Sequence, residues 1–186
     1  MNHLGTETIE TNRLILRRFV KSDIALAFKN WVTDERVTEF LTWEAHKNID
    51  ITDTVISSWI QDYEKNNFYQ WAIILKEINE PIGSIGAVSQ KENLDMVHIG
   101  YCIGYNWWNK GIVSEAFSAI IKFFFEQIKV NRIESLHDSN NPASGKVMLK
   151  CGLKYEGTLR QAGINNKGIV DTSMYSILAD EYRTNV

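Results

Sequence analysis

The residues best suited to chemistry lie between Ile99 and Ala116, where an apolar strand leads through a turn into an amphipathic segment. Gly111 stands in the turn. The apolar residues after it recur at helical spacing, which predicts a helix over residues 111–127 with a broad buried face. The first turn of such a helix has backbone N–H groups without intrahelical partners, and the helix dipole adds partial positive charge there. The stretch therefore predicts an anion site, with phosphate as the expected ligand.

A second candidate group lies at the start of a helix predicted over residues 142–150. Asn141 suits the cap position, Pro142 the first helical position, and Gly152 the left-handed residue just past the end. Ser144 shares one helical face with apolar and thiol side chains that are expected to point inward. Ser144 is therefore either a first-turn serine that bonds to the local backbone or a hydroxyl placed among inward-facing groups for chemistry.

Strands and helices are predicted along the whole chain, in an irregular order. Strands are expected over residues 14–19, 69–75, 82–88, 96–103, 132–136, 153–157 and 172–178, and helices over 22–31, 52–65, 111–127 and 142–150. The order βααβββαβαββ is not a repeated βαβ unit. We therefore expect an α/β fold with a mixed, mostly antiparallel central sheet flanked by helices.

Length and composition indicate one soluble domain over residues 1–186. The chain has 186 residues, of which 44% are hydrophobic, enough for a substantial core. No apolar run approaches the roughly 18 residues that span a bilayer, and no signal-peptide pattern is seen, so a cytoplasmic location away from membranes is expected. Cys102 and Cys151 are too isolated for a disulfide framework or a metal cluster, so no metal is expected. A formal net charge of -3 argues against nucleic acid as the main ligand and suits a cationic acceptor.

The stretch from Ile99 to Ala116 resembles the acetyl-CoA-binding segment of the GNAT superfamily of N-acetyltransferases, most closely its Rim-type branch of ribosomal-protein N-acetyltransferases. The pattern of that branch reads roughly I-G-Y-x-I-x-x-x-Y-W-G-K-G-Y-A-T-E-A, and Asn109 here replaces the first glycine of W-G-K-G. Asparagine tolerates left-handed backbone better than most residues, so the turn can survive this change. Three further segments match in the same order, and the resemblance covers nearly the whole chain: residues 11–18, 141–160 and 167–178.

The resemblance implies acetyl-CoA as co-substrate and assigns its contacts. The pantetheine is expected to pair with the backbone of residues 102–104, and the pyrophosphate to lie on the N–H groups of residues 109–114. Ser144 is implied as general acid or thiolate stabiliser. The cofactor-binding residues expected on this basis are Cys102, Ile103, Gly104, Asn109, Lys110, Gly111, Ile112, Val113, Ser114 and Asn141.

The general base is harder to assign, because an amine must lose its proton before it can attack a thioester. Some Rim-type enzymes use a glutamate at the position that matches Gly163 here, so that candidate is absent. His98 lies where many GNAT enzymes carry a glutamate that acts as the general base. The pKa of a free histidine is close to neutral. A strand histidine without a role and a water chain remain the alternatives.

The acceptor groove of GNAT enzymes is built from the region that corresponds to residues 37–46 and the two N-terminal helices. This implies Glu39, Trp43 and Glu44 as acceptor contacts. The expected function is acetyl transfer to a primary amine by direct transfer, with a protein N-terminal α-amino group as the first choice. A small amine such as a polyamine or antibiotic, and a non-catalytic acyl-CoA sensor, remain open. Homo-oligomerisation is left open as well.

Overall fold

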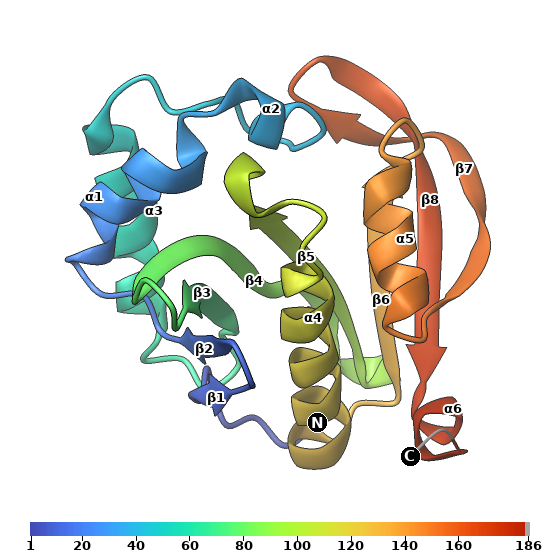
Figure 1. Cartoon of the computed structure of the whole chain (residues 1–186). Coiled ribbons are helices and arrows are strands. Elements are labelled where there is room, and N and C mark those ends of the chain that lie inside the picture. The colour runs from blue at the N-terminus through green and yellow to red at the C-terminus, as the bar shows by residue number, and fades with distance from the viewer. Residues whose placement is uncertain (185–186) are drawn as a thin grey trace.

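The computed structural model describes residues 1–184, and within them one eight-stranded sheet runs through the molecule (Figure 1). The strand order is β1-β2-β3-β4-β5-β6-β8-β7, and every neighbouring pair is antiparallel except β5 and β6. The predicted mixed, mostly antiparallel sheet is confirmed. Its strands are β1 (Ile9–Glu10), β2 (Leu14–Arg17), β3 (Gln70–Leu75), β4 (Glu80–Lys91), β5 (Met96–Ile103), β6 (Arg132–Asp138), β7 (Lys154–Asn165) and β8 (Gly168–Leu178).

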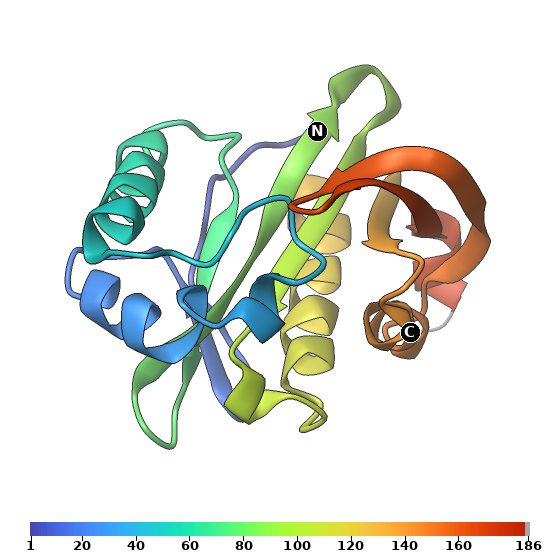
Figure 2. The ribbon, with the colours of Figure 1, turned by 90° about the horizontal axis from the view of Figure 1, so that it is seen from above.

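Helices cover both faces of this sheet, as the view from above shows (Figure 2). The long helix α4 and the helix α5 lie on one face, and α1 and α3 lie on the other. The α-helices are α1 (Asp23–Ala27), α2 (Glu35–Thr38), α3 (Ile49–Asp62), α4 (Ile112–Phe123), α5 (Pro142–Lys150) and α6 (Ala179–Thr184), with π segments at Phe28–Val32 and Phe124–Ile128 and 3-10 turns at Glu92–Leu94 and Tyr105–Trp107.

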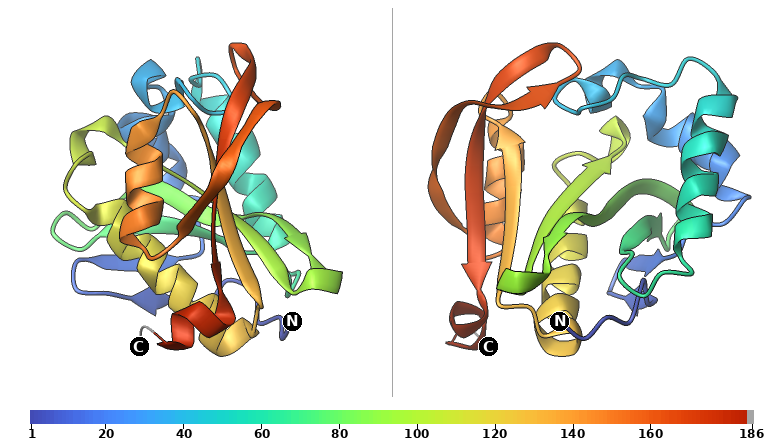
Figure 3. Two further views of the ribbon diagram at one scale, coloured as in Figure 1. Left: turned by 90° about the vertical axis from the view of Figure 1, so that its right-hand side faces the viewer. Right: turned by 180° about the vertical axis from the view of Figure 1, so that it is seen from behind.

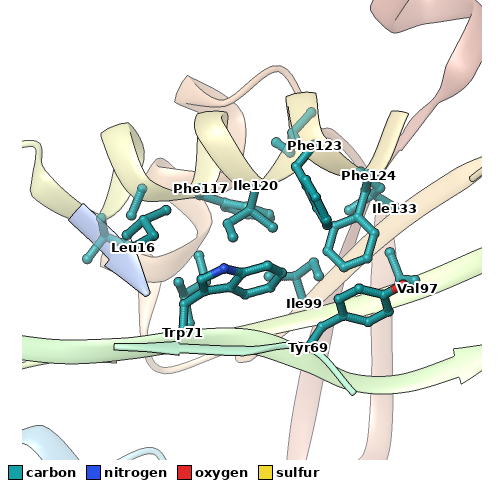
Figure 4. Close-up of a cluster of buried hydrophobic side chains, with 14 of the residues drawn as sticks. Leu16, Tyr69, Trp71, Val97, Ile99, Phe117, Ile120, Phe123, Phe124 and Ile133 are labelled. Carbon is teal, nitrogen blue, oxygen red and sulfur yellow. The ribbon is translucent and has the colours of Figure 1, made fainter. Parts of the chain in front are cut away.

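Alternation along β3 explains why the chain has two cores. Trp71 and Ile73 point toward α4, whereas Ala72 and Ile74 point toward α1 and α3, and all four are buried. Between the sheet and α4 the aromatic rings meet mostly edge to face, for example Trp71 on Phe123 at 5.6 Å between centroids (Figure 4). Each such pair adds about 0.5–1.5 kcal/mol beyond burial. This core fixes α4 firmly on the sheet.

Several predicted boundaries were wrong. The helix expected over residues 22–31 is α-helical only to Ala27, and the helix expected over 111–127 only to Phe123, because each then widens into a π turn. The strands expected over 153–157 and 172–178 are the paired halves of a long hairpin, β7 and β8. Its bulges and exposed polar residues break the apolar alternation on which the prediction relied, so the outer half of the hairpin gave no strand signal.

The parallel pair β5–β6 is short, and this opens the sheet. The two strands pair only from Met96 to His98 on β5 and from Arg132 to Glu134 on β6. Beyond that point a side chain makes the contact, because Ser135 Oγ donates to the Ile99 carbonyl at 2.7 Å. The strands then diverge, as the right-hand view of Figure 3 shows. We call the part of these two strands that is not paired the splay, which comprises residues 99–103 and 135–138.

Candidate active site

The predicted turn lies at the end of β5 and leads directly into α4. Asn109 has φ 58° and Gly111 has φ 71°, so both adopt the left-handed conformation. The prediction that Asn109 tolerates this backbone is therefore confirmed. The first helical hydrogen bond runs from the Glu115 N–H to the Gly111 carbonyl at 3.1 Å. The N–H groups of residues 112–114 consequently have no acceptor within the helix.

Two cations from distant parts of the chain lie beside this turn. A β-carbon built on Gly111 would be 3.6 Å from Lys150 Nζ and 3.8 Å from Arg13 Nη2. Lys150 is the last residue of α5, and Arg13 directly precedes β2. Helical N–H donors, two positive side chains and a glycine that keeps the space open fit a phosphate group. The predicted anion site thus includes two cationic side chains, Lys150 and Arg13, that the local sequence did not reveal.

The backbone N–H and C=O groups of successive β5 residues point alternately toward the splay and toward β4. The Gly104 N–H donates to the Ile82 carbonyl at 2.9 Å, while the Ile99 carbonyl accepts from Ser135 on the β6 side. Because an antiparallel ladder alternates, Cys102 faces β4 as Gly104 does, and Tyr101 and Ile103 face the splay as Ile99 does. Among residues 102–104, Ile103 is therefore the one whose backbone faces the splay. Its carbonyl accepts from the Trp108 indole at 2.9 Å.

Ser144 lies at the first turn of α5 and is joined to β5 by a side-chain contact. Tyr101 Oη lies 2.9 Å from Ser144 Oγ and 3.1 Å from the Ser144 carbonyl. Burial raises the pKa of Tyr101, so the phenol stays protonated and can donate to Ser144. The ring of Tyr101 packs on Phe117 of α4. Local sequence patterns did not single out Tyr101, because a tyrosine within an apolar strand looks like a core residue.

Asn141 does not cap α5 through its side chain, contrary to the prediction. Pro142 does occupy the first helical position, and Gly152 has φ 88° as predicted. The Ser144 N–H, from which a cap side chain could accept, instead donates to the backbone carbonyl of Asn141 at 3.1 Å. No side-chain hydrogen bond of Asn141 is present among residues 1–184, so its amide can still bind a ligand.

His98 lies on β5 but on the opposite face of the sheet from Tyr101. Its neighbours Val97 and Ile99 are buried against α4, and alternation turns His98 the other way. Its register partner on β6 is Glu134. Burial lowers the pKa of His98, and the nearby Glu134 carboxylate offsets part of this effect. His98 is therefore neutral at neutral pH, as a proton acceptor must be.

Glu156 is a structural carboxylate. It pairs with Arg132 at 2.6 Å and accepts from Ser176 Oγ at 2.6 Å. These hydrogen bonds lower the pKa of Glu156 to about 2. A carboxylate held ionised in this way cannot accept a proton near neutral pH.

The predicted acceptor residues lie around α2 and are joined to the tip of the β7–β8 hairpin. Lys167 pairs with Glu39 at 3.0 Å, and the Asn166 side-chain amide donates to the Trp43 carbonyl at 3.1 Å. Glu44 is exposed and lies 3.8 Å from Lys47. Glu39 and Trp43 are thus brought together by a hairpin more than a hundred residues away in sequence, while Glu44 stays outside this contact.

Among residues 1–184, no group of three or more histidine, cysteine, aspartate or glutamate side chains is arranged to hold a metal ion. No helix in the same range is long and apolar enough to cross a membrane. Cys102 and Cys151 are free thiols.

Sequence comparison identifies the family to which this fold and site belong. The family described as an acetyltransferase (GNAT) domain matches residues 13–154. The chain belongs to the GNAT acetyltransferase family. Its resemblance to the Rim-type branch is confirmed, because its relatives include ribosomal-protein acetyltransferases.

Individual GNAT proteins match most of the chain. The uncharacterized N-acetyltransferase YoaA of Bacillus subtilis (strain 168) is 33% identical over 172 residues, which cover 91% of this chain and 96% of YoaA. The ribosomal-protein-serine acetyltransferase of Escherichia coli (strain K12) is 30% identical over 108 residues, or 58% of this chain and 60% of that protein. The structure of RimL, a ribosomal L7/L12 alpha-N-protein acetyltransferase in complex with coenzyme A, superposes with a TM-score of 0.83 at 20% identity, covering 94% and 99% of the two chains. The chain is accordingly an acetyltransferase, and its co-substrate is acetyl-CoA.

Replacing Gly111 tests whether the turn binds the phosphate end of acetyl-CoA. Gly111→Val places a branched side chain in the left-handed turn between the two cations. We expect acetyl-CoA to bind at least about tenfold more weakly, which corresponds to ~1.4 kcal/mol. Calorimetric titration measures the affinity.

Gly5→Val is the matched control, because Gly5 has φ 73°, close to that of Gly111, but packs beside Arg18 and Asn66 and not beside the turn. It should lower stability without changing the affinity. Equal affinities of Gly111→Val and the parent protein would contradict the assignment of the turn.

Proposed function

We propose that this chain transfers the acetyl group of acetyl-CoA directly to a primary amine, with a protein N-terminal α-amino group as the acceptor. The observation that carries the proposal is the Tyr101–Ser144 hydrogen bond. It holds the Ser144 hydroxyl next to β5, the strand that leads into the Gly111 turn. The names of the relatives support a protein acceptor, since they include ribosomal-protein acetyltransferases. We place the reaction in the cytoplasm, which suits two free and separate thiols.

Residues on both sides of the splay would hold the co-substrate. In this proposal the N–H groups of Ile112, Val113 and Ser114 bind the pyrophosphate, with Lys110 and Asn109 shaping the turn. The Ile103 backbone pairs with the pantetheine once its carbonyl leaves the Trp108 indole. The free amide of Asn141 contacts the same arm from α5. The free N–H groups of the first turn of α4 and the amide of Asn141 support these roles.

Ser144 would assist departure of the sulfur. In this proposal the Tyr101 O–H hydrogen-bonds to Ser144 Oγ rather than to the Ser144 carbonyl, so the serine O–H is free to point at the CoA sulfur. As the amine nitrogen bonds to the acetyl carbon, the carbon–sulfur bond breaks and its electron pair stays on sulfur. A hydrogen bond aimed at this developing thiolate stabilises the transition state more than the ground state.

His98 would accept the proton that the attacking amine releases. It lies on the opposite sheet face from Tyr101, so the proton would be taken up on the face opposite the Tyr101–Ser144 pair. Its lowered pKa keeps the imidazole neutral and able to accept a proton. Glu39 and Trp43 would contact the acceptor near the α2 segment.

The acceptor is tested by a panel of amines. Peptides with free N-termini, the same peptides acetylated at the N-terminus but carrying a lysine, a polyamine and an aminoglycoside are compared by CoA thiol release and by mass of the product. We expect kcat/KM for free N-termini to exceed that of the others by at least about tenfold, which corresponds to ~1.4 kcal/mol in the transition state. A preference for a small amine would contradict a protein N-terminus as the acceptor. No transfer to any amine would indicate a non-catalytic acyl-CoA sensor.

Replacing Ser144 tests its role at the sulfur. Ser144→Ala should lower kcat by roughly 10²-fold, the usual effect of losing one positioned acid or donor, while acetyl-CoA affinity changes little. Ser118→Ala on the exposed face of α4 is the control and should retain activity. A loss of affinity alone, or a rate within about threefold of the parent protein, would show that Ser144 is only a structural residue of the first turn of α5.

The pH dependence tests His98. Because burial lowers the pKa of His98 below its usual 6.5, protonation should abolish the base only as the pH falls below that value. We therefore expect an acid limb of kcat/KM with a midpoint below 6.5, present in the parent protein and in His3→Gln, and absent in the slower His98→Ala. The same acid limb in His98→Ala would show that another group takes the proton.

A further inference from the structure

A network of hydrogen bonds joins the N-terminal segment to the first turn of α4. Glu115 Oε1 accepts from Thr11 Oγ1 at 2.6 Å and from the Arg13 N–H at 2.9 Å, and Glu115 Oε2 accepts from Arg13 Nε at 2.7 Å. Burial disfavours the ionised carboxyl, but the hydrogen bonds from Thr11 and Arg13 outweigh it and lower the pKa of Glu115. The Glu115 carboxylate is thus ionised, and both of its oxygens accept hydrogen bonds from this segment.

The rest of the Arg13 guanidinium faces the turn. Arg13 Nη1 donates to the Lys110 carbonyl at 3.0 Å, within the turn itself. Nη2 lies 3.8 Å from the place that a β-carbon on Gly111 would take, and it has no hydrogen-bond partner among residues 1–184. The side chain of Arg13 is 43% exposed, so a ligand at the turn can reach it. A guanidinium has five donors in a rigid fork, and here two of its three nitrogens are already fixed by the protein.

We propose that Arg13 binds a phosphate of acetyl-CoA through Nη2 and that Glu115 is the positioning residue that holds the guanidinium in place. The proposal rests on the proposed use of the Gly111 turn by the co-substrate. Arginine suits this position because its planar fork can bind Glu115 along one edge and phosphate oxygens with the remaining donors. Arg13 also neutralises Glu115, whose charge would otherwise repel an anion at the same helix end.

The two residues must act together for this site to work. Without Glu115 the guanidinium loses its strongest anchor and samples other rotamers, so binding the phosphate costs more conformational entropy. Without Arg13 both the phosphate contact and the neutralising charge are lost. Loss of Arg13 should therefore weaken binding more than loss of the charge on Glu115.

Acetyl-CoA and S-acetylpantetheine together test the proposal, because the second donor has the thioester arm but none of the phosphates. Four variants are compared with the parent protein: Arg13→Ala, Arg13→Lys, Glu115→Gln and, as control for loss of a surface arginine, Arg183→Ala. For each, calorimetry measures the Kd of CoA and of pantetheine, and kinetics measures KM and kcat with both donors. Thermal unfolding of the ligand-free variants confirms that they are folded.

We expect Arg13→Ala to raise the Kd of CoA and the KM of acetyl-CoA by at least about tenfold, with kcat within about twofold and no change toward pantetheine or S-acetylpantetheine. Glu115→Gln should show the same pattern at roughly threefold, and Arg13→Lys should recover part of the affinity because it keeps the charge. Arg183→Ala should match the parent protein.

Two results would overturn the proposal. An equal loss with S-acetylpantetheine would make Arg13 a structural residue of the turn, and unchanged affinity for CoA in a folded Arg13→Ala protein would exclude the contact. Failure of the underlying function looks different, since the parent protein would then bind neither CoA nor pantetheine and would transfer acetyl from neither donor.

Discussion

The backbone groups of β5 that lose β6 as a partner beyond His98 must be satisfied in some other way, and the site is built around this constraint. An unpaired N–H or C=O away from water costs about as much as a lost hydrogen bond. The Ile99 carbonyl is satisfied by Ser135 Oγ, and the Ile103 carbonyl by the Trp108 indole. A ligand that presents amide groups can replace such a contact. The divergence of two parallel strands thereby leaves an open backbone edge in the middle of the sheet.

The rigidity of the surroundings makes this edge useful. The aromatic core under α4 holds the helix at whose start the anion site is predicted, and the Thr11–Arg13 segment ties the start of that helix to the sheet edge. Tyr101 ties Ser144 on α5 to β5 across the splay. Each of these groups is therefore held in place by a contact with a second structural element. Such fixed donors lose little entropy when a ligand binds.

Local patterns in the sequence were sufficient for the parts of the site that depend on local structure. The glycine turn before an amphipathic helix, the asparagine that adopts a left-handed conformation and the proline that begins α5 all follow from spacing and conformational preference. The mixed sheet followed from the order of the elements. The π turns did not, because the apolar pattern of α4 continues through Phe124–Ile128 with no local signal for widening.

The site residues that are brought together only by tertiary contacts could not be predicted from those local patterns. Tyr101 looks like a core residue, and Lys150 and Arg13 look like solvated charges until the fold places them 3.6 and 3.8 Å from the Gly111 position. Asn141 was predicted to cap α5 with its side chain because asparagine precedes a proline, but the Ser144 N–H bonds to the backbone carbonyl of Asn141 instead. The long hairpin that brings Asn166 to α2 has bulges that hide its strand period. These contacts are set by packing between segments far apart in sequence.

Hydrogen exchange of individual backbone amides, with and without acetyl-CoA, tests the central claim most directly. If the co-substrate lies in the splay with its phosphates on the turn, the amides of Ile112, Val113 and Ser114 should gain protection, together with Ile103 on the open edge of β5. Gly104, whose N–H is already bonded to the Ile82 carbonyl, should change little. Protection that spares the turn and the edge of β5 while appearing elsewhere on the molecule would contradict the account.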